Sequence, residues 1–591
     1  MDLKMTITLS SLKVKNFRSC ADVELSLSRF TALVGYNNSG KSNIISAITW
    51  LLKKYSLTEQ DFFDISQPVE IEAIFSDIDQ LDIDLLPENQ RRQVEPYIEC
   101  KKIRARRVQL RPYARPAEIK FEIFDSHQSE WRNNPAGIDA ALSVLFPDPI
   151  SIGAMEDAAE DATKAKTTTT IGKLLAEFTR SIQSGHADEI NGHLQKVSDR
   201  LASSGQHRIR ELSIIDQQIN EKLQDVFPGV SIKLHFDVPT VADLIKAGTI
   251  KVAEGGGRER DITFFGHGTQ RSIQMTLIRH LAEVKRGDVL GGTTLLLIDE
   301  PELYMHPFAI EQVRSALKKL SNDRYQVIFS THSAQMIEAS DAQNTLHVRK
   351  NDAGKTMLRK RLKDAIDIVV PNAVHQIEHL FSLSNSSQFL FSDSVLVTEG
   401  KTEKKLLPHI FQSVKGRTFG QMKIALIALD GVGNLNKTIA ILRGMDLPAK
   451  AIVDLDYAFR GAIDEGILLA TDTDISALKK QLERMESRLE LNLDSATRLP
   501  VKGVQGSAAK GFELLAADAA SAAHIERLHA KLRLHNIWLW TKGSFEPHLG
   551  IRNKTEHAWA EYMNTVSTHG FEKACSGDPK TMGVLDWICG K

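Results

Sequence analysis

Residues 35–42, with the sequence GYNNSGKS, constrain the fold of this 591-residue chain more than any other segment. They match the Gly-x-x-x-x-Gly-Lys-Ser/Thr pattern of a phosphate-binding loop. The apolar run 30–34 before the loop predicts a buried strand, and the apolar spacing of residues 42–52 predicts a helix. A strand–loop–helix unit of this kind surrounds phosphate oxygens with backbone N–H groups. The segment therefore predicts an α/β nucleotide-binding domain.

The residue types in the loop suit a bound nucleotide. Glycines allow the backbone to approach closely, Lys41 reaches the β- and γ-phosphates, and Ser42 supplies a hydroxyl ligand for Mg²⁺. We predict that the nucleotide-binding residues of this segment are Gly35, Asn38, Gly40, Lys41, Ser42 and Asn43.

A second apolar run, residues 293–298, ends at Asp299 and Glu300 and predicts a buried parallel strand. Asp299 would hold the Mg²⁺ shell, and Glu300 would act in catalysis by polarising the attacking water. The alternative is a core strand that ends at an acidic turn. A third strand, 326–331, is followed by His332, which we predict to contact the γ-phosphate and sense hydrolysis.

Residues 265–272, FGHGTQRS, open a helical pattern and form a second anion-binding helix start. The motif resembles the signature of ABC-type ATPases, in which the signature of one subunit closes over ATP on another. The resemblance implies that Gly266, Gly268 and Gln270 bind ATP across a head-to-head dimer. The GKSN ending at 40–43 and NFRS at 16–19 are typical of the family's DNA-maintenance members rather than its transporters.

Carboxylates follow apolar runs in the last third of the chain. Glu399 follows the run 394–398, and Glu403 comes one helical turn later. Asp454 and Asp456 follow the run 450–453. The carboxyl ends of parallel strands share one edge of a sheet, and hard oxygen ligands there suit Mg²⁺ or Mn²⁺. The alternative is that these acids are merely exposed and cap helices.

This arrangement resembles a Toprim domain, the metal-binding α/β fold of topoisomerases, primases and some nucleases. The predicted metal ligands are Glu399, Glu403, Asp454, Asp456 and Glu546, with Glu399 and Asp454 also catalytic. A strand predicted over 536–540 precedes Lys542, which would neutralise charge on a scissile phosphate. For Lys542 and Glu546 the alternative is a surface turn with an acid at a helix N-terminus.

An ABC-type ATPase followed by a Toprim domain resembles the OLD (overcoming lysogenization defect) family of ATPase-nucleases. Lys542 and Glu546 match its late Lys-Gly-x-x-Glu element, and Glu513 and Asp518 are candidates for its remaining metal ligand, which the sequence does not assign. The resemblance implies an ATP-hydrolysing, divalent-metal-dependent DNA endonuclease that forms a homodimer or larger homo-oligomer and acts in defence against phage. A partner such as a helicase or reverse transcriptase stays open.

The predicted organisation is an ATPase domain over residues 1–385 and a Toprim nuclease domain over residues 386–591. A helical insertion is expected at about 150–235, with helical patterns over 171–182 and 190–202 and a strand returning at 230–234. In the second half, residues 477–489 predict a charged amphipathic helix.

A formal net charge of -1 argues against a uniformly basic nucleic-acid-binding protein, so a DNA-binding surface must be local. Residues 91–115 are rich in arginine and lysine and predict a strand with one basic face. That face either tracks phosphates or protects a solvated edge strand. Four widely spaced cysteines, no signal peptide and no apolar run near the ~20 residues of a membrane span lead us to expect a cytoplasmic protein.

Other functions compete with the nuclease. One is a DNA-binding, SMC-like structural ATPase whose Toprim half is a scaffold, although the chain lacks long heptad arms. Another is a topoisomerase-like or primase-like enzyme, but a topoisomerase needs a nucleophilic tyrosine in a companion domain. A third is an ATPase switch that controls a toxic partner.

Overall fold

The structure is a computed structural model that describes residues 7–84, 86–135, 138–146, 149–153, 186, 188–241, 244, 250–284, 293–322, 325–369, 386–429, 435–551, 555–574 and 578–590. The described residues form two compact units, one within 1–30 and 42–336 and the other within 31–41 and 337–591. The predicted boundary between residues 385 and 386 lies at the end of a segment outside the described residues, and it stays a prediction.

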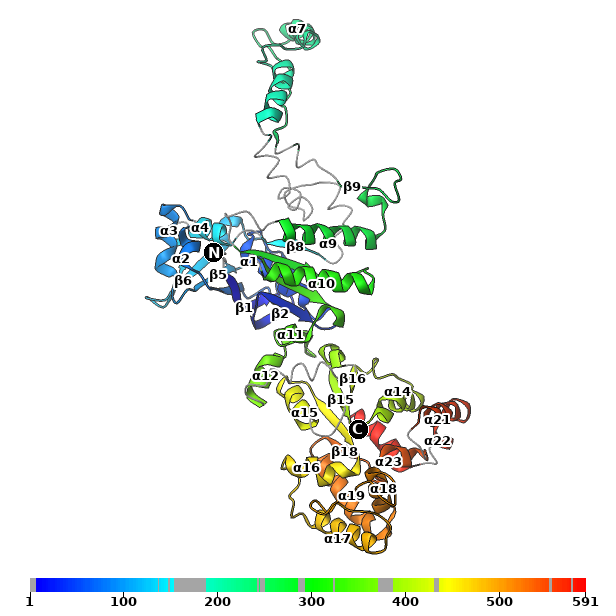
Figure 1. Ribbon diagram of the computed structural model, residues 1–591. Coiled ribbons are helices and arrows are strands. Elements are labelled where there is room, and N and C mark those ends of the chain that lie inside the picture. The colour runs from blue at the N-terminus through cyan, green and yellow to red at the C-terminus, as the bar shows by residue number, and fades with distance from the viewer. Residues whose placement is uncertain are drawn as a thin grey trace. The chain divides into compact units, whose positions relative to one another are not determined.

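A six-stranded antiparallel sheet forms the start of the first unit, drawn in blue and cyan in Figure 1. The strand predicted at 69–75 is confirmed, and its side chains alternate between buried and half-buried positions because a pleated strand points them to opposite faces. In sheet order the strands are β2 (Cys20–Ser26), β1 (Thr8–Phe17), β4 (Val69–Ser76), β5 (Ile103–Gln109), β6 (Lys120–Asp125) and β7 (Glu130–Asn133).

The arginine-rich strand β5 lies inside this sheet, between β4 and β6, so the alternative of a solvated edge strand was wrong. Arg104 forms an ion pair with Glu72, and Arg106 forms one with Glu122 at 2.6 Å. The Arg106 guanidinium also lies 4.3 Å from the centroid of the Trp131 ring. Glutamates on the neighbouring strands thus compensate these two arginines, which leaves the phosphate-tracking alternative without support at their positions.

Three parallel strands of the first unit surround the position of Asp299. Strand β11 (Thr294–Asp299) pairs with β12 (Tyr325–Thr331) and with β8 (Ile150–Ile152). Every residue of β12 is buried, as expected for a strand covered on both faces. Helix α10 (Pro307–Ser321) packs on β12 and on α9 (His267–Val284), and Figure 1 shows these two helices side by side.

The predicted insertion contains two helical segments in its described part, after strand β8. Residues 188–201 are helical, as predicted, and α7 (Arg210–Gln224) follows, whereas the pattern at 171–182 lies outside the described residues. The predicted strand at 230–234 was wrong, because side chains of α7 satisfy its backbone in place of a partner strand. Asn220 bonds both the N–H and the carbonyl oxygen of Ile232, and Asp216 accepts from the N–H of Leu234.

The second unit contains the phosphate-binding loop and a parallel sheet. Strand β13 (Leu346–Lys350) pairs in parallel with β3 (Phe30–Val34), which precedes the loop, and antiparallel with β14 (Thr356–Leu358). The other sheet has the order β16-β15-β17-β18, with every pair parallel. These strands are β16 (Ile424–Ala428), β15 (Ser394–Thr398), β17 (Ala449–Val453) and β18 (Ile537–Leu539). The predicted α/β class is confirmed.

Helices surround this parallel sheet, and side chains of α14, α21 and α23 form a core with Trp538 and Trp540. The helix predicted at 477–489 is confirmed as α17 (Thr473–Ser487). The other helices of the second unit are α11 (Ala339–Ala342), α12 (Leu362–Val369), α14 (Lys401–Lys415), α15 (Leu435–Gly444), α16 (Gly461–Asp464), α18 (Ala508–Ala517), α19 (Ala519–Arg533), α20 (Phe545–Leu549), α21 (Glu556–His569), α22 (Phe571–Ala574) and α23 (Pro579–Ile588).

The remaining elements are short, apart from the helix that follows the phosphate-binding loop. They are α1 (Lys41–Leu52), α2 (Gln80–Asp84), α3 (Glu88–Val94), α4 (Ile138–Leu145) and the paired strands β9 (Lys251–Val252) and β10 (Arg260–Asp261). Among the helices of the described residues, none is long and apolar enough to cross a membrane.

Candidate functional site

The phosphate-binding loop has the backbone that its glycines permit. Gly35 has a φ of +153°, and a Cβ atom there would lie 2.0 Å from the carbonyl oxygen of Val348. Only glycine fits such an approach of β13 to the loop. The Thr356 hydroxyl donates to the carbonyl oxygen of Ser39 at 3.1 Å, and Lys350 donates to the side-chain oxygen of Asn38 at 3.0 Å. Two strands therefore support the loop from one side.

Lys41 is 4% exposed, and its ammonium donates to the carbonyl oxygens of Gly35 at 3.0 Å and Tyr36 at 2.9 Å. The cation thus lies over the loop itself, where the pattern requires it. Ser42 is exposed at the start of α1. The Asn43 amide instead donates to the hydroxyl of Ser19 at 2.7 Å, so its predicted contact with a nucleotide stays a prediction.

Asp299, the last residue of β11, and Glu300, which follows it, are held by the end of β12. Asp299 accepts a hydrogen bond from the Ser330 hydroxyl, which in turn lies 3.0 Å from the backbone nitrogen of Glu300. Glu300 adopts a left-handed φ of 48°. Its carboxylate lies 3.1 Å from Nε2 of His332. Glu300 and His332 therefore form a contact pair, and their predicted roles in ATP hydrolysis stay predictions.

Two residues that carried no predicted role hold this pair in place. Glu302 accepts from the Thr331 hydroxyl at 2.6 Å and from the backbone N–H of His332 at 2.8 Å. Arg271 is 5% exposed and donates to the carbonyl oxygens of Asp299 at 2.8 Å and Glu300 at 2.9 Å. Arg271 lies within the predicted segment 265–272 and Glu302 lies two residues after Glu300, but only the contacts show their supporting roles.

The signature-like segment has a tight backbone at the start of α9. A Cβ atom on Gly268 would lie 2.9 Å from the carbonyl oxygen of Tyr304, whereas Gly266 has open space around it. Gln270 is 3% exposed and donates to the carbonyl oxygen of Phe265 at 2.7 Å. The predicted contacts of Gly266, Gly268 and Gln270 with a nucleotide on another subunit stay predictions.

Glu399 and Asp454 lie next to each other at the carboxyl edge of the parallel sheet. They follow the neighbouring strands β15 and β17, and the backbone N–H of Asp454 donates to the Glu399 carboxylate at 3.3 Å. Both residues and Asp456 are half-buried, so their carboxylates are sheltered and still open to an incoming group. The turn after β16, residues 430–434, lies outside the described residues.

Glu403 and Glu546 are buried deeper, at 3% and 4% exposure. Glu403 accepts from the indole N–H of Trp540 at 3.1 Å, and Glu546 accepts from the Thr402 hydroxyl at 2.6 Å. Within the described part of the chain, no group of three or more His, Cys, Asp or Glu side chains has metal-holding geometry. The predicted metal ligands therefore stay predictions, with Glu399, Asp454 and Asp456 the more accessible of the five.

Lys542 lies at the same edge of the sheet. The backbone N–H of Leu455, between the two aspartates, donates to the carbonyl oxygen of Gly543 at 2.8 Å. This bond joins the turn after β17 to the turn after β18. Gly543 has a φ of +97°, and a Cβ atom there would lie 2.8 Å from Cα of Glu513. The structure thus brings together the predicted Asp454, Asp456 and Lys542.

The two candidates for the remaining ligand differ in position. Glu513 accepts from the Ser544 hydroxyl at 2.9 Å and so lies beside the Lys542 turn. Asp518 stands at the start of α19, where it accepts from the Ser521 hydroxyl at 3.3 Å. Glu513 is therefore the candidate that contacts the carboxylate edge through this turn.

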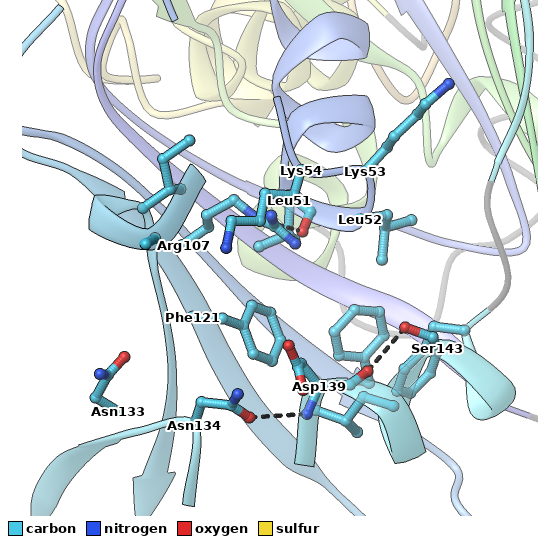
Figure 2. Close-up of a pocket in the computed structure, with 15 residues that line it drawn as sticks. Leu51, Leu52, Lys53, Lys54, Arg107, Phe121, Asn133, Asn134, Asp139 and Ser143 are labelled. Atoms are coloured by element: carbon cyan, nitrogen blue, oxygen red, sulfur yellow. Dashed lines mark hydrogen bonds between the residues drawn. The ribbon is translucent and has the colours of Figure 1, made fainter. Parts of the chain in front are cut away.

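A pocket of about 360 Å³ lies beside the C-terminal end of α1. Figure 2 shows Arg107 donating to the carbonyl oxygen of Leu51 and Asn134 accepting from the backbone N–H of Asp139. Burial lowers the pKa of Arg107 to about 10. The residues that line this pocket include none of the predicted site residues.

The structure combines a phosphate-binding loop with a parallel sheet whose carboxyl edge carries acids and a lysine. These are features of a nucleotide-dependent enzyme that acts on phosphate groups. Residues 7–337 match the AAA ATPase domain model, and residues 390–456 match the TOPRIM domain model of overcoming lysogenization defect protein-like proteins. The chain is 39% identical over 570 residues to the Old nuclease of Escherichia phage P2, which covers 95% of this chain and 96% of that protein. This chain belongs to the OLD family.

More distant relatives agree with this assignment. The chain is 23% identical to the OLD nuclease of Thermus scotoductus, over 76% of this chain and 82% of that protein. It is 22% identical to Endonuclease GajA of Bacillus cereus, over 69% of this chain and 68% of that protein. The two matched domain families imply the use of a nucleotide and of a divalent metal ion. The hard carboxylate oxygens of Glu399, Asp454 and Asp456 fit such an ion.

Proposed function

We infer that this protein is an ATP-dependent DNA endonuclease that hydrolyses phosphodiester bonds at the carboxyl edge of the β16-β15-β17-β18 sheet. The observation that carries the proposal is the hydrogen bond from Leu455 to Gly543, at 2.8 Å, which brings Lys542 to the edge where Glu399 and Asp454 meet. The family assignment and the nuclease relatives support the same reaction.

The acids at this edge provide the ligands that a divalent ion needs. We propose that Glu399, Asp454 and Asp456 hold Mg²⁺, or Mn²⁺ in its place, and that Glu403 and Glu546 complete or support this set. When bound, such ions activate water and stabilise a leaving 3′-oxygen. Because Glu513 contacts the Lys542 turn through Ser544, we propose Glu513 rather than Asp518 as the further ligand.

Lys542 acts on the DNA phosphate. Its side chain is half exposed and ends in an ammonium with three donors, so it can meet a phosphate while it keeps a contact with the protein. The charge that develops on the scissile phosphate during attack would be stabilised by this fixed cation.

The nucleotide site controls the enzyme. Lys41 and Ser42 bind the phosphates and Mg²⁺ of ATP, and Asp299 completes the metal shell. Glu300 polarises the attacking water, and Nε2 of His332 lies 3.1 Å from the Glu300 carboxylate. We propose that Gly266, Gly268 and Gln270 close over ATP on a second copy, which makes the active form a homodimer or a larger assembly.

Plasmid cleavage tests this function. Supercoiled DNA is incubated with the full chain, Mg²⁺ or Mn²⁺ and ATP, and Lys41→Ala is compared with wild type. The proposal predicts nicked or linear products that require the metal, and a rate that changes in Lys41→Ala. Intact plasmid under every condition, combined with normal ATP hydrolysis, would favour the SMC-like structural ATPase.

A role in phage defence follows from the family. We propose that cells expressing the active protein restrict a subset of phages, and that Glu399→Gln abolishes the restriction. Equal plaque counts on both strains across a broad phage panel would contradict this role.

A further inference from the structure

Lys542, His548 and Asp578 form a closed ring of contacts in the second unit. The backbone N–H of Lys542 donates to Nε2 of His548 at 3.1 Å, and Nδ1 of His548 lies 2.8 Å from Oδ2 of Asp578. The other carboxylate oxygen of Asp578 lies 2.9 Å from the Lys542 ammonium. The lysine is therefore held at its backbone and at the end of its side chain by the same pair of residues.

The contacts determine where the histidine proton lies. Since Nε2 accepts the Lys542 N–H, the proton of a neutral ring is on Nδ1, from which it is donated to Asp578. The His548 side chain is fully buried, and only a neutral ring can accept the Lys542 N–H at Nε2. The imidazole thus links the Lys542 backbone to the Asp578 carboxylate by two hydrogen bonds and fixes the carboxylate relative to that backbone.

The Asp578 carboxylate divides its two oxygens between two tasks. Oδ2 accepts from Nδ1 of His548 at 2.8 Å. It also accepts from the backbone N–H and from the hydroxyl of Thr581, both at 3.0 Å, and these two bonds cap α23. Oδ1 is left to Lys542. Although burial opposes ionisation, the hydrogen bonds from His548 and Lys542 hold the pKa of Asp578 well below its usual range, so the group is an anion at neutral pH.

A lysine side chain has many rotamers, so an unrestrained ammonium would occupy many positions. Asp578 is 7% exposed and rigidly bonded, whereas Lys542 is 50% exposed. The carboxylate therefore restrains one side of the ammonium and leaves the other side open to a phosphate.

We propose that Asp578, oriented by His548, is a positioning residue that holds the Lys542 ammonium at the carboxylate edge for phosphodiester cleavage. The proposal rests on the proposed nuclease function and on the role of Lys542 in it.

The test separates this role from the capping of α23. Asn is as good an N-cap as Asp, so Asp578→Asn keeps an oxygen for Thr581 and His548 but places an amide against the ammonium. The matched control is Asp586→Asn. Asp586 lies in α23, the helix that Asp578 caps, and its carboxylate pairs with Lys415 instead of Lys542. Metal-dependent plasmid cleavage, ATP hydrolysis and thermal unfolding of the full chain are measured for both variants, for Lys542→Ala and for Asp578→Asn with Lys542→Ala.

We expect Asp578→Asn to lower kcat for cleavage roughly 10- to 100-fold, in the range known for residues that orient an active group. KM for DNA, ATP hydrolysis and the melting temperature should stay close to wild type, and Asp586→Asn should cleave normally. In the Lys542→Ala background, Asp578→Asn should cause no further loss, because the two residues act as one unit.

Wild-type cleavage by Asp578→Asn would overturn the proposal, and so would an equal loss in the Lys542→Ala background, since that outcome indicates a purely structural role. Failure of the proposed function looks different: wild type then shows no metal-dependent cleavage, or Lys542→Ala cleaves normally, and either result removes the positioning role with it.

Discussion

The backbone N–H of Leu455 donates to the carbonyl oxygen of Gly543 at 2.8 Å, although the two residues are far apart in the chain. The bond ties the turn that carries Asp454 and Asp456 to the turn that carries Lys542. It lies beyond the carboxyl ends of β17 and β18, where the two strands no longer pair. The turns that carry the two aspartates and the lysine thereby lie side by side at one edge of the sheet, and the proposed phosphodiester hydrolysis depends on this arrangement.

Replacing Trp540 tests how firmly Glu403 is held. The fully buried indole donates to a carboxylate that is 3% exposed, so Trp540→Phe removes one charged hydrogen bond while keeping most of the aromatic volume. We expect the free energy of unfolding to fall by about 2 kcal/mol. Urea titration measures it, and Trp559→Phe, on the neighbouring helix α21, is the control. Equal stability of wild type and Trp540→Phe would mean that the bond contributes nothing.

Glu302 should support ATP hydrolysis without touching the nucleotide. Glu302→Ala removes the acceptor for the N–H of His332 and for the Thr331 hydroxyl, whereas Glu302→Gln keeps an oxygen for both. Loss of a hydrogen bond to a charged group costs about 1.5 kcal/mol or more, which corresponds to roughly tenfold in rate. Steady-state phosphate release should therefore fall about tenfold in Glu302→Ala and little in Glu302→Gln. Equal rates in the two variants would argue against the assigned contact.

Gly35→Ala should abolish ATP binding. The added Cβ would lie 2.0 Å from a backbone oxygen of β13, so the loop or the strand must move. Gly192→Ala is the control, because its Cβ would meet nothing within 4 Å. That residue lies in a helix, where alanine is favoured by roughly 1 kcal/mol. Nucleotide binding by isothermal calorimetry should be lost only in Gly35→Ala, and normal affinity in that variant would contradict the loop geometry.

Asp474 makes the second unit sensitive to acid. Burial opposes its ionisation, but hydrogen bonds from Arg527, Lys531 and His524 hold its pKa well below the unfolded value of about 3.9. A depressed pKa contributes stability that is present above pH ~4 and is lost as the pH falls through the folded pKa. We therefore expect Asp474→Asn to unfold at lower urea than wild type at pH 7, with the difference shrinking by pH 3. A difference that grows toward low pH would have the wrong sign.

Features of the fold and site whose residues lie close together in the sequence were predictable, whereas features that depend on contacts between distant residues were not. The phosphate-binding loop and the acids after β15 and β17 were predictable because each lies in a local strand–turn–helix pattern with its chemistry in the same few residues. The strand at 230–234 was mispredicted because alternation cannot show that Asn220 and Asp216 bond its backbone in place of a partner strand.

The partner of Lys542 was missed for a related reason. Asp578 lies 36 positions later in the sequence, and its only local signal, an aspartate three residues before Thr581, indicates a helix cap. Only the fold reveals that its second oxygen faces the lysine. The interior position of β5 was likewise invisible, because a basic strand reads as an edge until the glutamates of its neighbours are placed.

We propose above all that Glu399 and Asp454 form a metal-dependent nuclease site. This proposal is tested most directly by cleavage of supercoiled plasmid with Mg²⁺ or Mn²⁺, comparing wild type with Glu399→Gln and with the control Glu556→Gln, which affects only an exposed ion pair with Lys405. We predict metal-dependent cleavage by wild type and by the control, and equal ATP hydrolysis by all three proteins. Cleavage by Glu399→Gln should be at least about 100-fold slower, because a neutral amide replaces a carboxylate ligand of the proposed ion, and loss of groups that only orient such ligands already costs roughly 10- to 100-fold. Cleavage by Glu399→Gln at the wild-type rate would contradict the account.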